Sequence, residues 1–203
     1  DFDFPLDRIE ALIDNTPLYR DKAIYALIAA SGMRPGEARQ IRLEDIDIEN
    51  RRVYVVSPFE RSNPGITADE FRHLAWKGRE TAETFLVEPW ATIFFNSLLE
   101  YFRREYIPTT GHPFIFQTLN GQSWGRPYYA ADRSSRIKQF NKRAAEADVS
   151  LPTGVSEHSL RHAYAVYLVN YLPTPQGLGL SLTLVAVLLG HADINSTKTY
   201  ARH

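Results

Sequence analysis

The sequence predicts a mainly α-helical domain with one small antiparallel β-sheet, an α+β arrangement. Apolar residues recur at intervals of three and four along much of the 203-residue chain, which is typical of amphipathic helices. Only one early stretch, Arg52–Ser57, is rich in the valine and tyrosine that favour strands. A hydrophobic share of 44% with 23% charged residues is ordinary for a globular protein, and the chain has no cysteine for a disulfide or a thiolate metal site.

Two helices are expected near the start of the chain, at Asp7–Asn15 and Leu18–Ser31. Gly32 provides a C-terminal stop for the second helix, because glycine readily adopts the left-handed conformation that ends helices. Pro35 suits the first position of the next helix, where a backbone N–H has no partner in any case. Arg34 therefore lies at the entrance of a helix.

The expected sheet combines Arg52–Ser57 with two plausible partner strands, Phe71–Trp76 and Thr84–Val87. The segment Ser-Asn-Pro-Gly at residues 62–65 is rich in turn-forming residues and predicts a loop.

The second half of the chain predicts a mostly helical ending, with apolar residues at helical spacing. The expected helices are Trp90–Tyr106, Tyr128–Ala147, Glu157–Tyr171, Leu182–Leu189 and Asn195–Arg202.

Charge and hydropathy limit the classes of function. No apolar run approaches the ~18 residues needed to cross a bilayer, and no basic segment precedes an apolar one at the start, so we expect a cytoplasmic protein with no membrane partner. The formal net charge of −1 does not favour binding to a polyanion. However, residues 1–50 carry 6 basic and 11 acidic side chains, whereas residues 111–150 carry 6 basic and 3 acidic ones. This asymmetry permits a local basic face.

Three separate segments carry groups suited to phosphate chemistry. They are Gly-Met-Arg-Pro-Gly-Glu at 32–37, His-Ser-Leu-Arg-His at 158–162, and Leu-Leu-Gly-His followed nine residues later by a tyrosine, at 188–200. Metal-free cleavage of a phosphodiester needs fixed donors for the non-bridging oxygens, a nucleophile and groups that move protons. Arginine binds phosphate oxygens with a planar fork and stays charged.

Each segment alone permits a plainer interpretation. Arg34 could pair with Glu37 on the surface, and His191 could simply cap the helix before it. His158 and His162 are spaced i, i+4, as in some zinc sites, but the glutamate of a His-Glu-x-x-His site is missing. Tyr200 is one of 11 tyrosines and taken alone would be a packing residue.

Taken together and in this order, the three segments resemble the signature of the tyrosine recombinases, also called phage-type integrases. The resemblance implies the tyrosine recombinase catalytic-domain fold for residues 1–203, without the separate N-terminal core-binding domain of that family. It implies that Arg34 and Arg161 clamp the phosphate, His158 assists proton transfer and His191 donates a hydrogen bond to the scissile phosphate. It also implies that Tyr200 is the nucleophile.

The family also uses a lysine on a β-hairpin turn to protonate the departing 5′ oxygen. Lys77 lies between the first two motif segments, and its surroundings resemble the family pattern loosely. The alternative is an ordinary solvated lysine. Two stretches look like insertions relative to the family, namely residues 59–72 and a loop at Pro173–Gly179.

The resemblance implies a metal-independent, cofactor-free site-specific DNA recombinase or integrase that works through a 3′-phosphotyrosyl intermediate. Its expected partners are double-stranded DNA at a recombination site and other copies of itself, as a tetramer on DNA. The expected setting is the nucleoid of a prokaryote or a phage-infected cell, with a phage, transposon or other mobile genetic element as the source. The alternatives are a type IB topoisomerase-like enzyme, a DNA-binding module with a vestigial site and, third, a metal-dependent nuclease.

Overall fold

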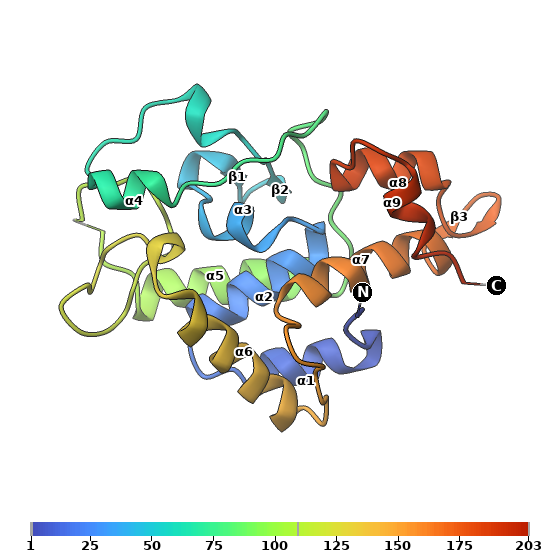
Figure 1. Cartoon of the computed structure of the whole chain (residues 1–203), viewed down its shortest axis with the longest axis horizontal. Helices are drawn as coiled ribbons and strands as arrows, with labels where there is room; N and C mark the ends of the chain where they lie inside the picture. The colour runs from blue at the N-terminus through green and yellow to red at the C-terminus, as the bar shows by residue number, and fades with distance from the viewer. Residues whose placement is uncertain (1, 109, 203) are drawn as a thin grey trace.

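The computed structural model describes residues 2–108 and 110–202, and it is mainly helical, as predicted (Figure 1). The α-helices are α1 (Ile9–Asp14), α2 (Tyr19–Ser31), α3 (Pro35–Arg39), α4 (Ala68–Arg72), α5 (Trp90–Arg104), α6 (Arg133–Glu146), α7 (His158–Asn170), α8 (Leu182–Leu189) and α9 (Asn195–Lys198). Short 3-10 turns lie at η1 (Leu6–Arg8), η2 (Leu43–Asp45), η3 (Pro58–Glu60) and η4 (Tyr128–Ala130). None of these helices combines the length and apolarity needed to span a bilayer.

Helix α2 lies at the centre of the molecule and packs against both α5 and α7 (Figure 1). Nearly all of its side chains from Ala23 to Ser31 are fully buried, which is typical of a helix with neighbours on every side. The main hydrophobic core that includes α2 also holds the large, fully buried side chains of Tyr101, Tyr164, Phe4, Phe94, Phe116 and Phe140. The first motif segment follows α2 directly and the second begins α7. Both are therefore attached to the rigid core.

Both sheets are very small, and the main one differs from the prediction. Strand β2 (Arg52–Val53) pairs with β1 (Ile46–Asp47), a partner that the sequence did not indicate. The predicted partner Thr84–Val87 joins only at its edge, through a bridge between Tyr54 and Glu83 and a hydrogen bond from the Thr84 N–H to the Val53 carbonyl (3.0 Å).

The predicted strand Phe71–Trp76 is wrong. Its first residues close helix α4, which begins with a capping box in which the Thr67 hydroxyl accepts from the Glu70 N–H and the Glu70 carboxylate accepts from the Thr67 N–H. This reciprocal pair satisfies two backbone donors that would otherwise lack partners. The Thr-x-x-Glu pattern outweighs the strand propensity of the apolar residues after it.

One helix starts later than predicted, and another ends earlier. Helix α6 begins at Arg133 rather than Tyr128, because Asp132 caps its first turn by accepting from the Ser135 N–H (2.8 Å). The predicted helix Asn195–Arg202 is only α9, which ends at Lys198, so Tyr200 lies outside it.

Within Pro173–Gly179, residues Pro173–Thr174 (β3) and Gly177–Leu178 (β4) pair as a hairpin in place of the predicted loop.

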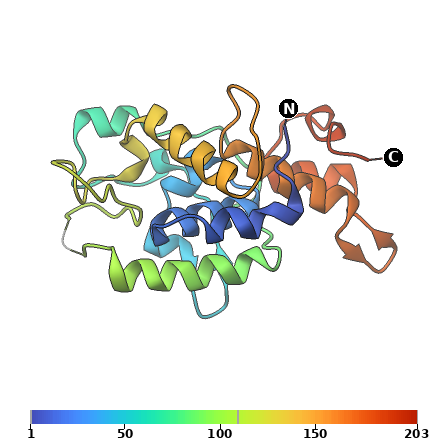
Figure 2. The ribbon, with the colours of Figure 1, turned by 90° about the horizontal axis from the view of Figure 1, so that it is seen from below.

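The two ends of the described chain meet beside α7. The Phe4 N–H donates to the Ser159 carbonyl (3.0 Å), and Arg202 pairs with Asp3 (2.9 Å). Figure 2 shows the N-terminal segment alongside the C-terminal helices. The start of the chain thus supports the helix that carries the central motif.

Candidate active site

Arg34 and Arg161, which are far apart in the sequence, converge at the C-terminal end of α8. Arg161 on α7 is 3% exposed and donates from Nη1 to the Gly32 carbonyl (2.7 Å) and from Nη2 to the Leu189 carbonyl (2.7 Å). Arg34 caps α3 and approaches the next carbonyl, that of Gly190, at 3.4 Å. The structure therefore brings the two predicted phosphate clamps together.

Burial and the neighbouring charge of Arg34 lower the pKa of Arg161 to about 10, which still leaves it charged at neutral pH. An arginine carries five N–H donors, and Arg161 uses one on each of its two carbonyl partners. Donors on both guanidiniums remain available for an anion placed between them.

Glu37 orients Arg34 through both its backbone and its side chain. Its carboxylate accepts from the Arg34 N–H (2.8 Å) and lies 3.4 Å from Arg34 Nη1. The pair foreseen from the sequence does form, but the Glu37 side chain is only 3% exposed, so it belongs to the site and not to a solvated surface. A third guanidinium, that of Arg79, lies 3.7 Å from the same carboxylate.

Three arginines and one carboxylate leave this cluster with an excess of two positive charges. A phosphodiester carries one negative charge, and more charge collects on its oxygens in the transition state. The electrostatics of Arg34, Arg79, Arg161 and Glu37 suit such a group.

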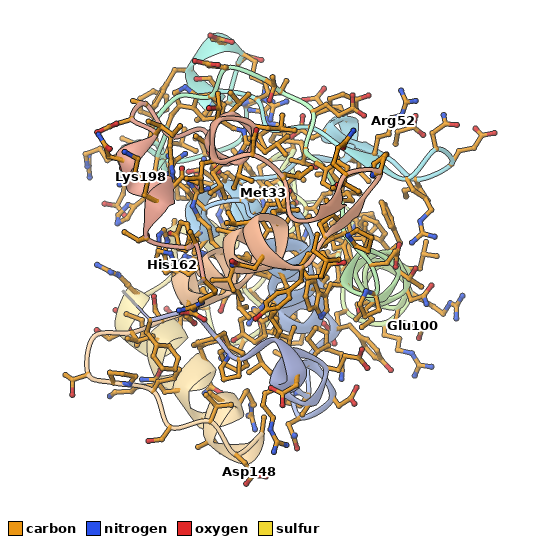
Figure 3. All side chains as sticks on the ribbon, turned by 90° about the vertical axis from the view of Figure 1, so that its right-hand side faces the viewer. Met33, Arg52, Glu100, Asp148, His162 and Lys198 are labelled. Atoms are coloured by element: carbon orange, nitrogen blue, oxygen red, sulfur yellow. The ribbon has the colours of Figure 1, made fainter. Side chains whose placement is uncertain are left out.

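Tyr200 is 6% exposed and its hydroxyl hydrogen-bonds to Nδ1 of His162. Burial raises the pKa of the Tyr200 phenol, while the nearby charge of Arg161 lowers it. The phenol is therefore protonated at neutral pH and needs a base before it can attack. Figure 3 looks onto the side of the molecule that carries α8 and α9, where His162 is labelled.

His162 thus takes the position beside the phenol that the sequence interpretation gave to His158. The His158 ring packs edge-on against His162, with centroids 4.8 Å apart, and does not bond to Tyr200. His158 itself is exposed, yet desolvation of its ring and the charges of His162, Arg161, Arg34 and Lys77 lower its pKa to about 4. Desolvation and the charge of Arg161 also lower the pKa of His162, so both rings are neutral at pH 7.

His191 lies directly after Gly190, which ends α8 in the left-handed conformation with φ of 71°. Its Nδ1 bonds to the Thr197 hydroxyl (2.8 Å), which orients the ring. Burial, together with the charges of Arg161 and Arg34, lowers the pKa of His191 to about 4. A neutral ring bonded through Nδ1 keeps Nε2 as a further donor or acceptor.

Lys77 is exposed on the turn that faces α8, near enough to His158 for its charge to affect that ring. All six residues singled out from the sequence, Arg34, Lys77, His158, Arg161, His191 and Tyr200, therefore belong to one region. They are supplied by α3, the turn at 77–79, α7 and the segment after α8.

Two hollows can be compared with this cluster. The larger, about 870 Å³, lies between α2, α6 and residues 118–128, and none of the six residues lines it. A smaller one of about 230 Å³ lies beside His158 and is lined by Arg39, Arg133 and Arg136. Arg34, Arg161 and Tyr200 line neither hollow, so their cluster at the end of α8 is the candidate site. Within residues 2–108 and 110–202, no three His, Asp or Glu side chains gather as a metal site would require.

Comparison with known proteins agrees with this geometry. The profile of the phage integrase family matches residues 4–203. The chain belongs to this family. Its relatives within the family include the tyrosine recombinase XerC of Lactobacillus delbrueckii subsp. bulgaricus, which is 26% identical over 95% of this chain and 54% of its own length. The chain thus spans about half the length of that relative.

Solved integrase-family structures share the fold. The XerA recombinase superposes over 100% of this chain and 59% of its own, with a TM-score of 0.68 and 20% identity. The XerH site-specific recombinase bound to difH substrate in a pre-cleavage complex covers 100% of this chain and 51% of its own, with a TM-score of 0.64 and 18% identity. These likenesses confirm the predicted fold class of a tyrosine recombinase catalytic domain.

Sequence reasoning missed three residues that shape the site. Arg79 was not singled out, and His162 was considered only as one of two histidines at a zinc-like spacing. Asn170, at the end of α7, donates to the Tyr200 carbonyl (2.7 Å) and accepts from the Arg202 N–H (2.7 Å), which places the backbone on both sides of Tyr200. His162 could have been found from its adjacency to Arg161, whereas nothing local marks Asn170.

Proposed function

We propose that this chain cleaves and rejoins double-stranded DNA through a covalent bond between Tyr200 and a 3′ phosphate. The observation that carries the proposal is the convergence of Arg34 and Arg161 on the end of α8, with the Tyr200 hydroxyl close enough to Arg161 to sense its charge. Family membership supports it, as does the DNA complex of the similarly folded XerH.

In the proposed reaction the Tyr200 oxygen attacks the scissile phosphorus while Arg34, Arg161 and His191 hold the non-bridging oxygens. His162 accepts the phenol proton, since it is the ring bonded to that hydroxyl, and His158 packs behind it. The bond to the 5′ oxygen breaks and Lys77 gives that oxygen a proton. Attack by a 5′ hydroxyl of another strand reverses the step and releases Tyr200.

Strand exchange between two duplexes needs more than one active chain, so we propose that the protein acts as a homo-oligomer on DNA, with four copies expected. The proposed role is recombination or integration at a specific DNA site, and the proposed compartment is the cytoplasm, where bacterial DNA lies. Residues 111–150, with their excess of basic side chains, are the part of the chain best suited to the DNA backbone.

The direct test is adduct formation on a nicked DNA substrate that loses the short 5′ fragment after cleavage and so traps the intermediate. The whole protein should yield a DNA-linked species that survives denaturation. The variant Tyr200→Phe should yield none, while its DNA affinity stays within about twofold of the parent, because only the nucleophile is removed.

The matched control is Tyr171→Phe, which alters a tyrosine that is 48% exposed at the end of α7. It should form the adduct at the parental rate. An adduct that persists in Tyr200→Phe would refute the nucleophile, and salt-dependent DNA binding by the parent with no adduct would point to a binding module instead.

A further inference from the structure

The Arg79 side chain is held inside the protein although it belongs to an otherwise exposed turn. It is 1% exposed, whereas Lys77, two residues earlier, is exposed. Its Nη2 donates to the Leu188 carbonyl in the last turn of α8 (2.7 Å), and its Nε donates to the Thr81 carbonyl within its own turn (3.3 Å). One guanidinium thus ties the turn to the helix that ends beside the catalytic cluster.

The turn and the end of α8 approach each other very closely. A Cβ atom added at Gly190 would lie 3.1 Å from Arg79 Cγ and 3.3 Å from the Gly78 carbonyl oxygen. Gly78 has φ of 85°, a conformation that glycine adopts without strain. The turn that holds Gly78 is therefore placed against the end of α8 by close backbone packing as well as by the Arg79 guanidinium.

Stability alone is a poor explanation for this arrangement. Burial lowers the pKa of Arg79, and its Nη1 has no hydrogen-bond acceptor among the described residues, only the Glu37 carboxylate at 3.7 Å. A buried, incompletely paired charge costs free energy that an apolar side chain would avoid. Such a cost is typical of groups kept for a purpose other than folding.

We propose that Arg79 is a positioning residue that holds the turn carrying Lys77 against the end of α8, so that the lysine reaches the departing 5′ oxygen. This inference rests on the proposed function, in which Lys77 is the proton donor. Only Gly78 lies between the two residues, so their Cα atoms are at most about 7 Å apart and the placement of Arg79 restricts that of Lys77. A reacting group displaced by about 1 Å can lose a factor of about 100 in rate.

A second role would involve the same side chain, because Arg79 could simply add positive charge to the phosphate site. The two roles differ in which part of the reaction they assist. Positioning of Lys77 matters only when the leaving oxygen needs a proton. Charge near the non-bridging oxygens matters whatever atom leaves.

The experiment therefore compares cleavage of ordinary DNA with cleavage of DNA in which sulfur replaces the bridging 5′ oxygen. A thiol has a pKa of about 8.5, so a thiolate leaves without a proton donor. We expect Arg79→Ala to cleave ordinary DNA about 100-fold more slowly than the parent in single-turnover assays, and the sulfur substrate within about threefold of it. Lys77→Ala should behave in the same way, whereas Arg34→Ala should be slow on both substrates.

The matched control is Arg52→Ala, which removes an arginine that is 56% exposed on β2 and should leave both rates unchanged. Arg79→Lys serves if the alanine variant does not fold. It keeps the charge but loses the fork that contacts two carbonyls, so we expect a loss of about tenfold on ordinary DNA and full recovery on the sulfur substrate.

Slow cleavage of both substrates by folded Arg79 variants would overturn the inference in favour of a charge at the phosphate, and an unchanged rate on ordinary DNA would overturn it outright. The inference would also be overturned if the sulfur substrate does not restore the cleavage rate of Lys77→Ala. Tyr200→Phe is assayed in parallel: cleavage by that variant, or no cleavage by the parent, would remove the proposed function itself, so the two failures are distinguishable.

Discussion

Single residues in this site act through the charge and desolvation that their neighbours impose. The guanidiniums of Arg34 and Arg79 pair with one carboxylate, that of Glu37, which also affects the pKa of Arg161, so the cluster keeps an excess of positive charge. Desolvation and the charges of Arg161 and Arg34 lower the pKa values of His158 and His191 to about 4. Neutral imidazoles beside a cationic phosphate site can accept a proton at neutral pH, which protonated ones cannot.

A pH prediction follows for the base beside Tyr200. The pKa of His162 is lowered below its ordinary value of 6.5, so the ring stays able to accept a proton as the pH falls through 6.5. We expect the single-turnover cleavage rate to be level from pH 7.5 to 6.5 and to decline only at lower pH, as His162 becomes protonated.

His162→Gln should slow cleavage by about 100-fold or more at every pH, because general bases contribute about 10² to 10⁴ in rate. It should also remove the decline of the rate at low pH, which we call the acid limb of the pH profile. His158→Gln is the comparison and should retain the limb. If the acid limb stays in His162→Gln and is lost in His158→Gln, the proton acceptor is His158.

At the scale of elements, the site depends on how two helices end. Gly32 ends α2 with φ of 68°, and Gly190 ends α8 with φ of 71°. The left-handed residue turns the chain sharply at each end, and each end exposes a carbonyl that Arg161 uses, those of Gly32 and Leu189. Arg161 therefore joins the two helix ends on which the proposed phosphate site is built.

Gly32→Ala should be strongly destabilising. An added Cβ would lie 2.3 Å from the ring of Tyr164, which is fully buried and cannot move aside freely. We expect a loss of about 2 to 4 kcal/mol in the free energy of unfolding, from the left-handed conformation and from overpacking. Urea denaturation followed by circular dichroism measures it.

Gly154→Ala is the matched control for that substitution. Gly154 also has a positive φ, of 84°, but an added Cβ would meet nothing within 4 Å. Its cost should be only about 1 to 2 kcal/mol, that of the conformation itself. Equal losses in the two variants would mean that the contact with Tyr164 does not limit position 32.

At the scale of the whole molecule, the start of the chain fastens the helix that carries the site. Phe4 is fully buried, packs against Phe140 of α6 at a centroid distance of 6.0 Å and donates its N–H to Ser159 at the first turn of α7. The N-terminal segment is therefore packed against the start of α7, and Figure 1 shows the N-terminus beside that helix.

Phe4→Ala should lower the free energy of unfolding by about 3 to 5 kcal/mol, the usual cost of removing a buried phenylalanine ring. Trp124→Ala, at a position that is 57% exposed, should change it by less than about 0.5 kcal/mol. Urea titrations of both variants provide the comparison. A loss below 1 kcal/mol in Phe4→Ala would show that the N-terminal segment is not coupled to the core.

The sequence by itself determined the helices with strong apolar periodicity, and it indicated five candidate site residues in the motif segments with Lys77 as a sixth, because periodicity and motif spacing are local properties of the chain. Leu182–Leu189 was predicted with its observed bounds, whereas the strand at Phe71–Trp76 was not formed because a capping box acted instead. Only the tertiary structure decided which histidine meets Tyr200, that Asn170 holds the backbone around it, and that Arg79 turns inward. Each of these depends on contacts between segments 30 or more residues apart, whose approach is set by packing of the whole core and is recorded in no short stretch of sequence.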